Sequence, residues 1–118
     1  MIKTIHTNYA PAAIGPYSQA VEANGFIFCS GQVGIDPAIK TISGNIETQT
    51  QQVMENLSEV LKAAGSDLDH VVKTTIYLTN ITDFTKVNEI YGQYFTNHKP
   101  ARATVEVSKL PKGKPPSL

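Results

Sequence analysis

Apolar residues recur every three or four positions over residues 53–64, as they do along one face of an α-helix, and we expect this helix to span residues 46–64. Gly65 follows directly, and glycine commonly ends helices. A second stretch with the same spacing follows Asp83, which can cap a helix, and Pro100 forbids its continuation. The pattern therefore predicts two amphipathic helices. The apolar face of the second carries Phe84, Val87, Tyr91 and Tyr94.

Four shorter apolar segments predict β-strands. Residues 17–23 and 26–32 flank Asn24-Gly25, a dipeptide that accepts the positive φ angles of a tight turn, so these two segments are predicted to form a hairpin. Residues 70–78 and 101–107 lie before and after the second helix, and each shows the alternation that is typical of a strand.

The predicted order of elements is an optional first strand followed by ββαβαβ, which indicates an α+β domain. The last strand–helix–strand unit implies two parallel strands. We expect one mixed sheet with both helices packed on one face, and a loop over residues 34–45. The opposite face is too apolar to meet water, which predicts a homo-oligomer built through the sheets. The length of 118 residues fits one domain.

Charge and composition argue against several classes of function. The ten basic and ten acidic residues cancel, so no basic stripe is available for nucleic-acid phosphates. The chain starts without the apolar core of a signal peptide and has no apolar run as long as a membrane span, which predicts the cytoplasm and no membrane association. The single Cys29 excludes an internal disulfide, and its apolar strand predicts a small buried residue. The three histidines lack metal-ligand spacing, so no metal is expected.

Arg102 is the only arginine in the chain and lies inside a predicted strand. If Ala103 and Val105 face the helices, alternation points Arg102 to the opposite face, where we expect the subunit contact. A guanidinium there needs a partner, and its planar fork suits a carboxylate. Glu106 is too far along the same strand to be that partner. Residue type alone leaves two interpretations equal: an interface salt bridge and a ligand site.

Four further positions carry candidate chemistry, each with a structural alternative. Tyr17 can wall a pocket, although a core or interface role is commoner for tyrosine. Ser30-Gly31 ends the hairpin, where Gly31 permits close approach of a ligand or marks a bulge. Asn88 lies beside the apolar face of the second helix and either braces a loop or orients a ligand. Lys73 is either an activated amine or a lysine that reaches solvent or pairs with a carboxylate.

Five stretches of the chain, in this order and at these separations, resemble the reactive intermediate deaminase family, whose members are also called translation-initiation-inhibitor-like or endoribonuclease L-PSP-like proteins. Each stretch is weakly specific alone, and the five together are highly specific. They cover most of the chain, from about residue 6 to residue 113. The stretches are 13–20 (AIGPYSQA), 28–34 (FCSGQVG), 71–78 (VVKTTIYL), 84–91 (FTKVNEIY) and 100–107 (PARATVEV), followed by Leu110-Pro111.

The resemblance implies a chorismate-mutase-like fold and a homotrimer. In such a trimer the sheets line a central barrel, the helices lie outside, and three sites occupy the clefts between subunits. It also implies a reaction, the hydrolysis of 2-imino or enamine acids such as 2-iminopropanoate and 2-iminobutanoate to 2-keto acids and ammonia. These imines arise from 2-aminoacrylate-type intermediates. No metal or organic cofactor is implied.

The same resemblance implies roles for individual residues. The arginine that binds the substrate carboxylate corresponds to Arg102, the pocket tyrosine to Tyr17, and the asparagine near the site to Asn88. The remaining positions line the pocket or lie near it: Ser30, Gly31, the backbone of Thr104, and Lys73. A two-point grip on the carboxylate would orient the C=N bond for attack by water.

The resemblance stops after Gly113, where family members run into a further strand that carries a glutamate. Residues 114–118 read Lys-Pro-Pro-Ser-Leu, and adjacent prolines lack the N–H donors of a central strand. The sequence therefore predicts a deaminase-family domain over residues 1–113 and a short Pro-rich tail in place of that strand. A non-catalytic carboxylate-binding or chaperone-like module remains the alternative to an imine deaminase. The balanced charge argues against a third class, a ribonuclease.

Overall fold

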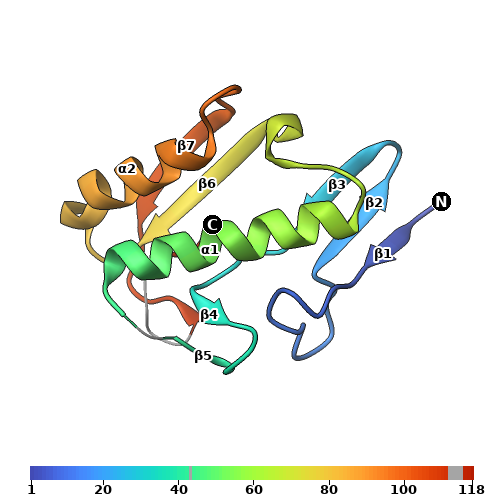
Figure 1. Cartoon of the computed structure of the whole chain (residues 1–118), viewed down its shortest axis with the longest axis horizontal. Coiled ribbons are helices and arrows are strands. Elements are labelled where there is room, and N and C mark those ends of the chain that lie inside the picture. Colours follow the sequence, from blue (N-terminus) through green and yellow to red (C-terminus); the bar gives the residue numbers. More distant parts are fainter. Residues whose placement is uncertain (43, 112–115) are drawn as a thin grey trace.

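The computed structural model describes residues 1–42, 44–111 and 116–118. The predicted helices are confirmed as α1 (Ile46–Ala63) and α2 (Phe84–Tyr94). Single 3₁₀ turns, η1 (Leu68–His70) and η2 (Ile81–Asp83), precede β6 and α2. The strands are β1 (Lys3–Ile5), β2 (Ala20–Ala23), β3 (Phe26–Cys29), β4 (Ile35–Asp36), β5 (Thr41–Ile42), β6 (Lys73–Leu78) and β7 (Ala101–Glu106) (Figure 1).

The predicted hairpin is confirmed, although its strands are shorter than the apolar segments. Asn24 and Gly25 take φ angles of 52° and 79°, and Ala23 pairs with Phe26 across the turn. Residues 17–19 and 30–32 lie outside β2 and β3. The apolar pattern predicts where the hairpin lies but not where its strands end. The strands end where β2 and β3 stop pairing with each other, which the apolar pattern does not specify.

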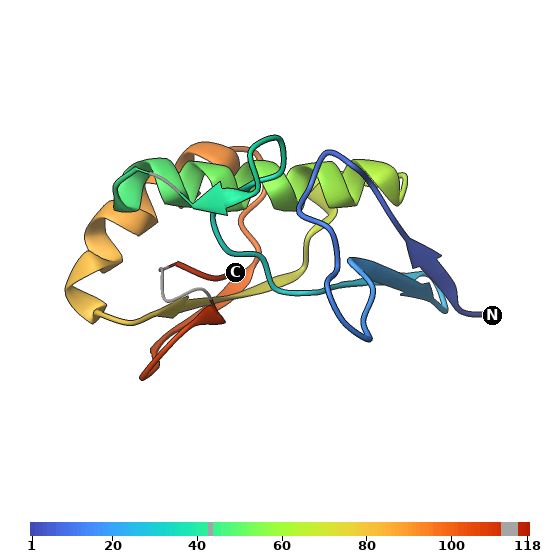
Figure 2. The same cartoon turned by 90° about the horizontal axis from the view of Figure 1, so that it is seen from below.

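Both helices lie on one side of β2, β3, β6 and β7, whereas β4 lies level with α1 (Figure 2). The parallel pairing of β6 and β7 is confirmed. The expected single sheet is wrong in detail, because the strands form separate sheets β1-β2-β3, β4-β5 and β6-β7. β4 and β5 form within the predicted loop over residues 34–45. In the described part of the chain, no helix has the length and apolarity of a membrane span.

The last residues of the chain lie between β6 and the segment that follows β3. Ser117 forms antiparallel bridges with both Val33 and Tyr77. Its N–H donates to the Tyr77 carbonyl at 3.0 Å, and its carbonyl accepts from the Tyr77 N–H at 2.8 Å. Leu118 and Gln32 exchange a similar pair of bonds, at 3.0 and 2.8 Å. The described residues of the predicted Pro-rich tail therefore form no named strand, although Ser117 and Leu118 pair with the backbones of Tyr77 and Gln32.

The physical reason lies in where the prolines stand. A proline denies a donor only at its own position, and Pro116 is buried just before the two residues that pair. The predicted domain boundary at residue 113 and Pro115 both fall within residues 112–115, which lie outside the described part of the chain.

Side-chain caps explain where the helices begin. Asn45 caps α1, and its Oδ1 accepts a hydrogen bond from the Thr48 N–H at 3.0 Å. The predicted cap at Asp83 is wrong, because its side chain makes no capping bond and its backbone is already helical. Asn80 caps η2 instead through the N–H of Thr82. The 3₁₀ turn runs directly into α2, so the helical path begins earlier than the apolar spacing indicates.

The core has two clusters that share α1. One joins α1 to α2 and β6, and its buried residues are Met54, Ile76, Leu78, Val87, Tyr91 and Phe95. The other joins the end of α1 to the β1–β2 region through Ile5, Ala10, Ala20 and Val60. Because Ile76 and Leu78 both face the helices, the alternation of β6 leaves Lys73, Thr75 and Tyr77 on the opposite face.

The backbone at Gly34 lies close against the backbone of α1. A Cβ added there would lie 3.0 Å from the Gln49 carbonyl oxygen and 3.2 Å from its Cα. The segment cannot easily move away, because the amide of buried Asn56 donates to the carbonyls of Val33 and Ile35 at 3.2 and 2.9 Å. We therefore expect Gly34→Ala to lower the free energy of unfolding by about 1–3 kcal/mol in urea denaturation.

Gly92 in α2 provides the matched control for Gly34. An added Cβ at Gly92 would meet no atom within 4 Å, so Gly92→Ala should raise the free energy of unfolding by about 0.5–1 kcal/mol through helix propensity. If Gly34→Ala proves as stable as the unmodified chain, the protein does not have the close contact between Gly34 and Gln49 of α1.

Candidate functional site

Arg102 is the second residue of β7 and lies against α2. The parallel register places it beside Thr74 of β6. Its Nη1 donates to Oδ1 of Asn88 at 2.7 Å. The guanidinium carbon lies 4.9 Å from the ring centre of Tyr91 and 5.4 Å from that of Phe84. One helix therefore supplies both an amide partner and two aromatic rings to the only arginine of the chain.

The predicted orientation of Arg102 is wrong. Residues paired across parallel strands share a face, and Ile76, paired with Thr104, is fully buried under the helices. Arg102 therefore points toward the helices, while Val105 is 40% exposed on the other face. The sequence interpretation assumed that small apolar side chains would be the buried set, but the register with β6 decides the face.

The guanidinium of Arg102 keeps several donors for a ligand. It carries five N–H donors, and the neutral amide of Asn88 occupies one nitrogen. None of the ion pairs among the described residues includes Arg102. Glu106, on the same strand, instead accepts a hydrogen bond from the Ile81 N–H at 2.8 Å. The interface salt bridge, which requires a second chain, stays a prediction.

A pocket of about 420 Å³ opens beside this arginine. Two of its walls come from α2 and the start of β7, and the segment between them adds a second cation, Lys99. The lining residues are Asn88, Tyr91, Gly92, Phe95, Lys99, Pro100 and Arg102. Cationic and amide donors beside aromatic surface are suited to a small ligand that bears a carboxylate.

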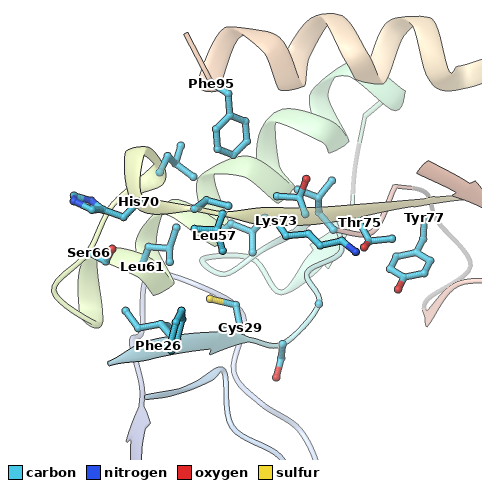
Figure 3. A pocket seen from close by; sticks show the side chains of 18 of the residues that line it. Phe26, Cys29, Leu57, Leu61, Ser66, His70, Lys73, Thr75, Tyr77 and Phe95 are labelled. Atoms are coloured by element: carbon cyan, nitrogen blue, oxygen red, sulfur yellow. The ribbon is translucent and has the colours of Figure 1, made fainter. Parts of the chain in front are cut away.

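A second, larger cleft of about 610 Å³ lies between β3 and β6. Figure 3 shows Lys73, Thr75 and Tyr77 along β6, with Phe26 and Cys29 across from them on β3. The predicted site residues Ser30, Gly31 and Lys73 all line this cleft. They therefore form a group of their own, away from Arg102 and Asn88.

Tyr17 is held near this cleft by the loop that precedes β2. The Ser30 hydroxyl donates to the Ser18 carbonyl, and the Ser30 N–H donates to the Gln19 carbonyl at 2.9 Å. Buried Gln19 braces the loop by accepting from the Thr7 N–H at 2.7 Å and donating to the Pro11 carbonyl at 2.8 Å. Tyr17 itself is 54% exposed. The loop thus presents this tyrosine to the surface rather than to the core.

The predicted site residues therefore fall into two groups within one chain. Arg102 and Asn88 form the first, and Ser30, Gly31 and Lys73 form the second. Tyr17 lies on the loop that Ser30 holds through Ser18 and Gln19. Thr104 is half-buried on β7, on the same face as Arg102. No side-chain hydrogen bond or ion pair within the described ranges joins Lys73 to Arg102, because alternation places Lys73 on the opposite face of the β6-β7 pair from Arg102.

Sequence reasoning missed three residues that shape the site. Tyr91 and Phe84 were assigned to the apolar face of α2, and their spacing gives no sign that they also contact a guanidinium. Gln19 was not singled out, although a glutamine between a loop and a strand needs several partners once buried. Of the three, only Gln19 could have been recognised from the sequence, because a buried glutamine needs hydrogen-bond partners.

Cys29 departs from its predicted burial. The residue is exposed at the rim of the large cleft, although its thiol lies close enough to the cleft walls for burial to raise its pKa. The prediction of a buried cysteine is wrong because β3 places this position at the cleft that opens between β3, α1 and β6. The raised pKa disfavours the thiolate and hence a nucleophilic role at neutral pH.

We expect Cys29 to react with iodoacetamide more slowly in the folded chain than in the chain unfolded by urea, both at pH 8. The thiolate is the reacting form, and a raised pKa leaves less of it. The folded-state rate should keep rising with pH beyond the midpoint of the unfolded chain, as followed by mass spectrometry. Identical pH profiles in the two states would contradict this. Cys29 is the only cysteine, so the signal is unambiguous.

Comparison with known proteins supports one family. The family model described as Endoribonuclease L-PSP matches residues 7–115. Protein DfrA of Myxococcus xanthus is 54% identical over 114 residues, which cover 94% of this chain and 87% of that protein. The 2-iminobutanoate/2-iminopropanoate deaminase of Homo sapiens is 51% identical over 112 residues, or 94% of this chain and 82% of that protein.

Solved structures agree with the sequence matches. A protein of the conserved Rid family from Yersinia pestis superposes with a TM-score of 0.97 at 48% identity, covering 99% of this chain and 94% of that one. TdcF of E. coli, solved with bound serine, superposes with a TM-score of 0.93 at 36% identity, covering 98% and 93%. The chain therefore belongs to the endoribonuclease L-PSP family, which includes the Rid proteins and the 2-iminobutanoate/2-iminopropanoate deaminases.

Proposed function

We propose that this chain hydrolyses 2-imino acids, 2-iminopropanoate and 2-iminobutanoate among them, to 2-keto acids and ammonia. One observation carries the proposal. Arg102 is held by Asn88 at 2.7 Å beside a pocket, and within the described ranges it has no acidic partner. A charged fork with free donors in such a place is suited to a carboxylate. The human, mouse and rat relatives named 2-iminobutanoate/2-iminopropanoate deaminase support this substrate class.

The reaction requires little beyond positioning. Arg102 binds the carboxylate through two N–H donors and fixes the adjacent C=N carbon in the pocket. A water oxygen adds to that carbon, and its proton passes to the imine nitrogen. The tetrahedral aminoalcohol then loses ammonia as the C–N bond breaks and the C=O bond forms. The protonated imine is already electrophilic, so donors fixed in advance supply most of the assistance.

The second group of residues is proposed to complete the site from a neighbouring copy of the chain. Tyr17 would close the pocket over the substrate, with Ser30 and Gly31 as its lining. The Thr104 backbone would add a further donor or acceptor from the strand that carries Arg102. Lys73 would lie at the edge of the pocket. This assignment explains why one chain keeps these residues apart from Arg102, since a site between subunits needs half of its residues from each.

The open face of the strands supports the assembly that this requires. Phe26 and Phe28 are 59% and 64% exposed, and they alternate with Ile27, which packs on the core. Tyr77 and Val105 are 39% and 40% exposed on the face of β6 and β7 that no helix covers (Figure 2). Apolar side chains in such number favour a contact with another copy. A homotrimer with its sheets turned inward, in a chorismate-mutase-like arrangement, is the proposed assembly.

The test is the release of ammonia and keto acid from freshly generated 2-iminopropanoate, with and without the chain. The proposal expects both products to appear together, well above the spontaneous rate in buffer. If the rate equals that of buffer while pyruvate still binds, the non-catalytic carboxylate-binding module becomes the better account. If pyruvate does not bind either, the carboxylate site at Arg102 is wrong.

A further inference from the structure

Tyr91 connects the strand pair to the guanidinium of Arg102. Its hydroxyl forms a hydrogen bond with Oγ1 of Thr74 at 2.7 Å. Thr74 is the residue of β6 that pairs directly with Arg102 of β7. The ring of Tyr91 lies under the guanidinium at 4.9 Å, and the Phe84 ring lies at 5.4 Å. Tyr91 of α2 therefore contacts both Thr74 of β6 and Arg102 of β7.

We propose that Tyr91 is a positioning residue, which together with Phe84 holds the Arg102 guanidinium in the plane where its fork meets the substrate. Thr74 fixes the Tyr91 ring in turn. The inference rests on the proposed function only in giving Arg102 a carboxylate to bind. The contacts of Arg102 with Tyr91 and Phe84, together with the Thr74–Tyr91 hydrogen bond, are called the clamp here. They do not depend on the reaction.

The division of the guanidinium surface explains why the clamp and a ligand do not compete. Aromatic rings interact with the flat face of an arginine, whereas its N–H donors point outward in the plane. Asn88 takes one donor at one edge, which leaves the other edge to a carboxylate. An arginine side chain otherwise loses substantial rotamer freedom on binding, and a side chain held in advance loses less.

If Tyr91 served only to fill the core, loss of its hydroxyl would not affect Arg102. The ring belongs to the core with Met54, Ile76 and Val87, and a phenylalanine would fill the same volume. The hydroxyl adds nothing to that packing, yet it is bonded to the one threonine that lies beside Arg102. Removal of the hydroxyl alone therefore separates the two roles without opening a cavity.

The experiment uses the fact that Arg102 is the only arginine. In the ¹⁵N-labelled chain its guanidinium gives one Nε–Hε signal, and pyruvate serves as the carboxylate probe. The variants are Tyr91→Phe, which removes the hydroxyl, and Thr74→Val, which removes its partner. Tyr94→Phe is the matched control, because it removes from the same helix a hydroxyl that instead binds Glu55 at 2.9 Å.

We expect Tyr91→Phe and Thr74→Val each to speed exchange of the Nε–Hε proton with water. Each should also raise the Kd for pyruvate about two- to tenfold, the equivalent of one hydrogen bond. In turnover, KM should rise by a similar factor while kcat changes less. Phe84→Leu, which removes the second ring, should raise the Kd about tenfold. Tyr94→Phe should leave the signal and the Kd as they are in the unmodified chain.

Two results separate the clamp from the proposed function. If Tyr91→Phe and Thr74→Val leave the Nε–Hε signal and the Kd unchanged, the clamp is wrong, even where Arg102→Ala abolishes binding. If the unmodified chain fails to bind pyruvate but the two variants still accelerate exchange of the Nε–Hε proton, the clamp stands and the carboxylate site is wrong.

Discussion

Replacing Arg102 with alanine is expected to lower kcat/KM for 2-iminopropanoate about 100- to 1000-fold, the usual effect of losing a donor placed in advance at the reacting group. The change removes both the charge and the fork that fix the carboxylate. It also leaves Asn88 and the Tyr91 ring without the group they hold. The measurement is the initial rate of pyruvate and ammonia release, with the spontaneous rate subtracted.

Two further variants make this result specific. Arg102→Lys keeps the charge but loses the planar fork, so it should recover only part of the lost activity. Lys62→Ala removes an exposed cation that pairs with Glu59 on α1, far from the pocket, and should leave the rate unchanged. If Arg102→Ala keeps half or more of the rate, Arg102 does not bind the substrate carboxylate and the proposed site is wrong.

A glutamate in place of Val105 is expected to separate the proposed assembly into single chains and to abolish turnover with it. Val105 is 40% exposed on the face opposite the helices, and it pairs with Tyr77 across β6 and β7. A carboxylate trapped without a partner in an apolar contact costs about 3–5 kcal/mol, which weakens association roughly 100- to 1000-fold or more. Light scattering after gel filtration reports the mass, and the imine assay reports the activity.

The control for this variant is the same substitution elsewhere on the surface. Ile39 is 59% exposed in the turn between β4 and β5, away from the open strand face. Ile39→Glu should therefore keep the mass and the activity of the unmodified chain. A Val105→Glu variant that keeps both would show that this face is not the subunit contact. An unmodified chain that is active as a single copy would show that the site needs no neighbour.

The sequence by itself determined the local elements of this protein. Apolar residues at helical spacing predict α1 and α2, and Asn24-Gly25 predicts the turn of the hairpin. These signals are short-range, because a helix or a tight turn depends on residues a few positions apart. The five stretches that resemble the deaminase family also indicated the family that the comparisons confirm.

Tertiary structure alone decided which residues meet. Alternation in β7 shows that Arg102 and Val105 lie on opposite faces, but not which face is covered. That choice depends on the register with β6, whose Ile76 is buried under helices that the β7 pattern does not encode. The pairing of Ser117 likewise depends on Tyr77, a partner distant in sequence. A local pattern specifies how a segment folds, whereas the neighbours of a side chain are set by contacts between distant segments.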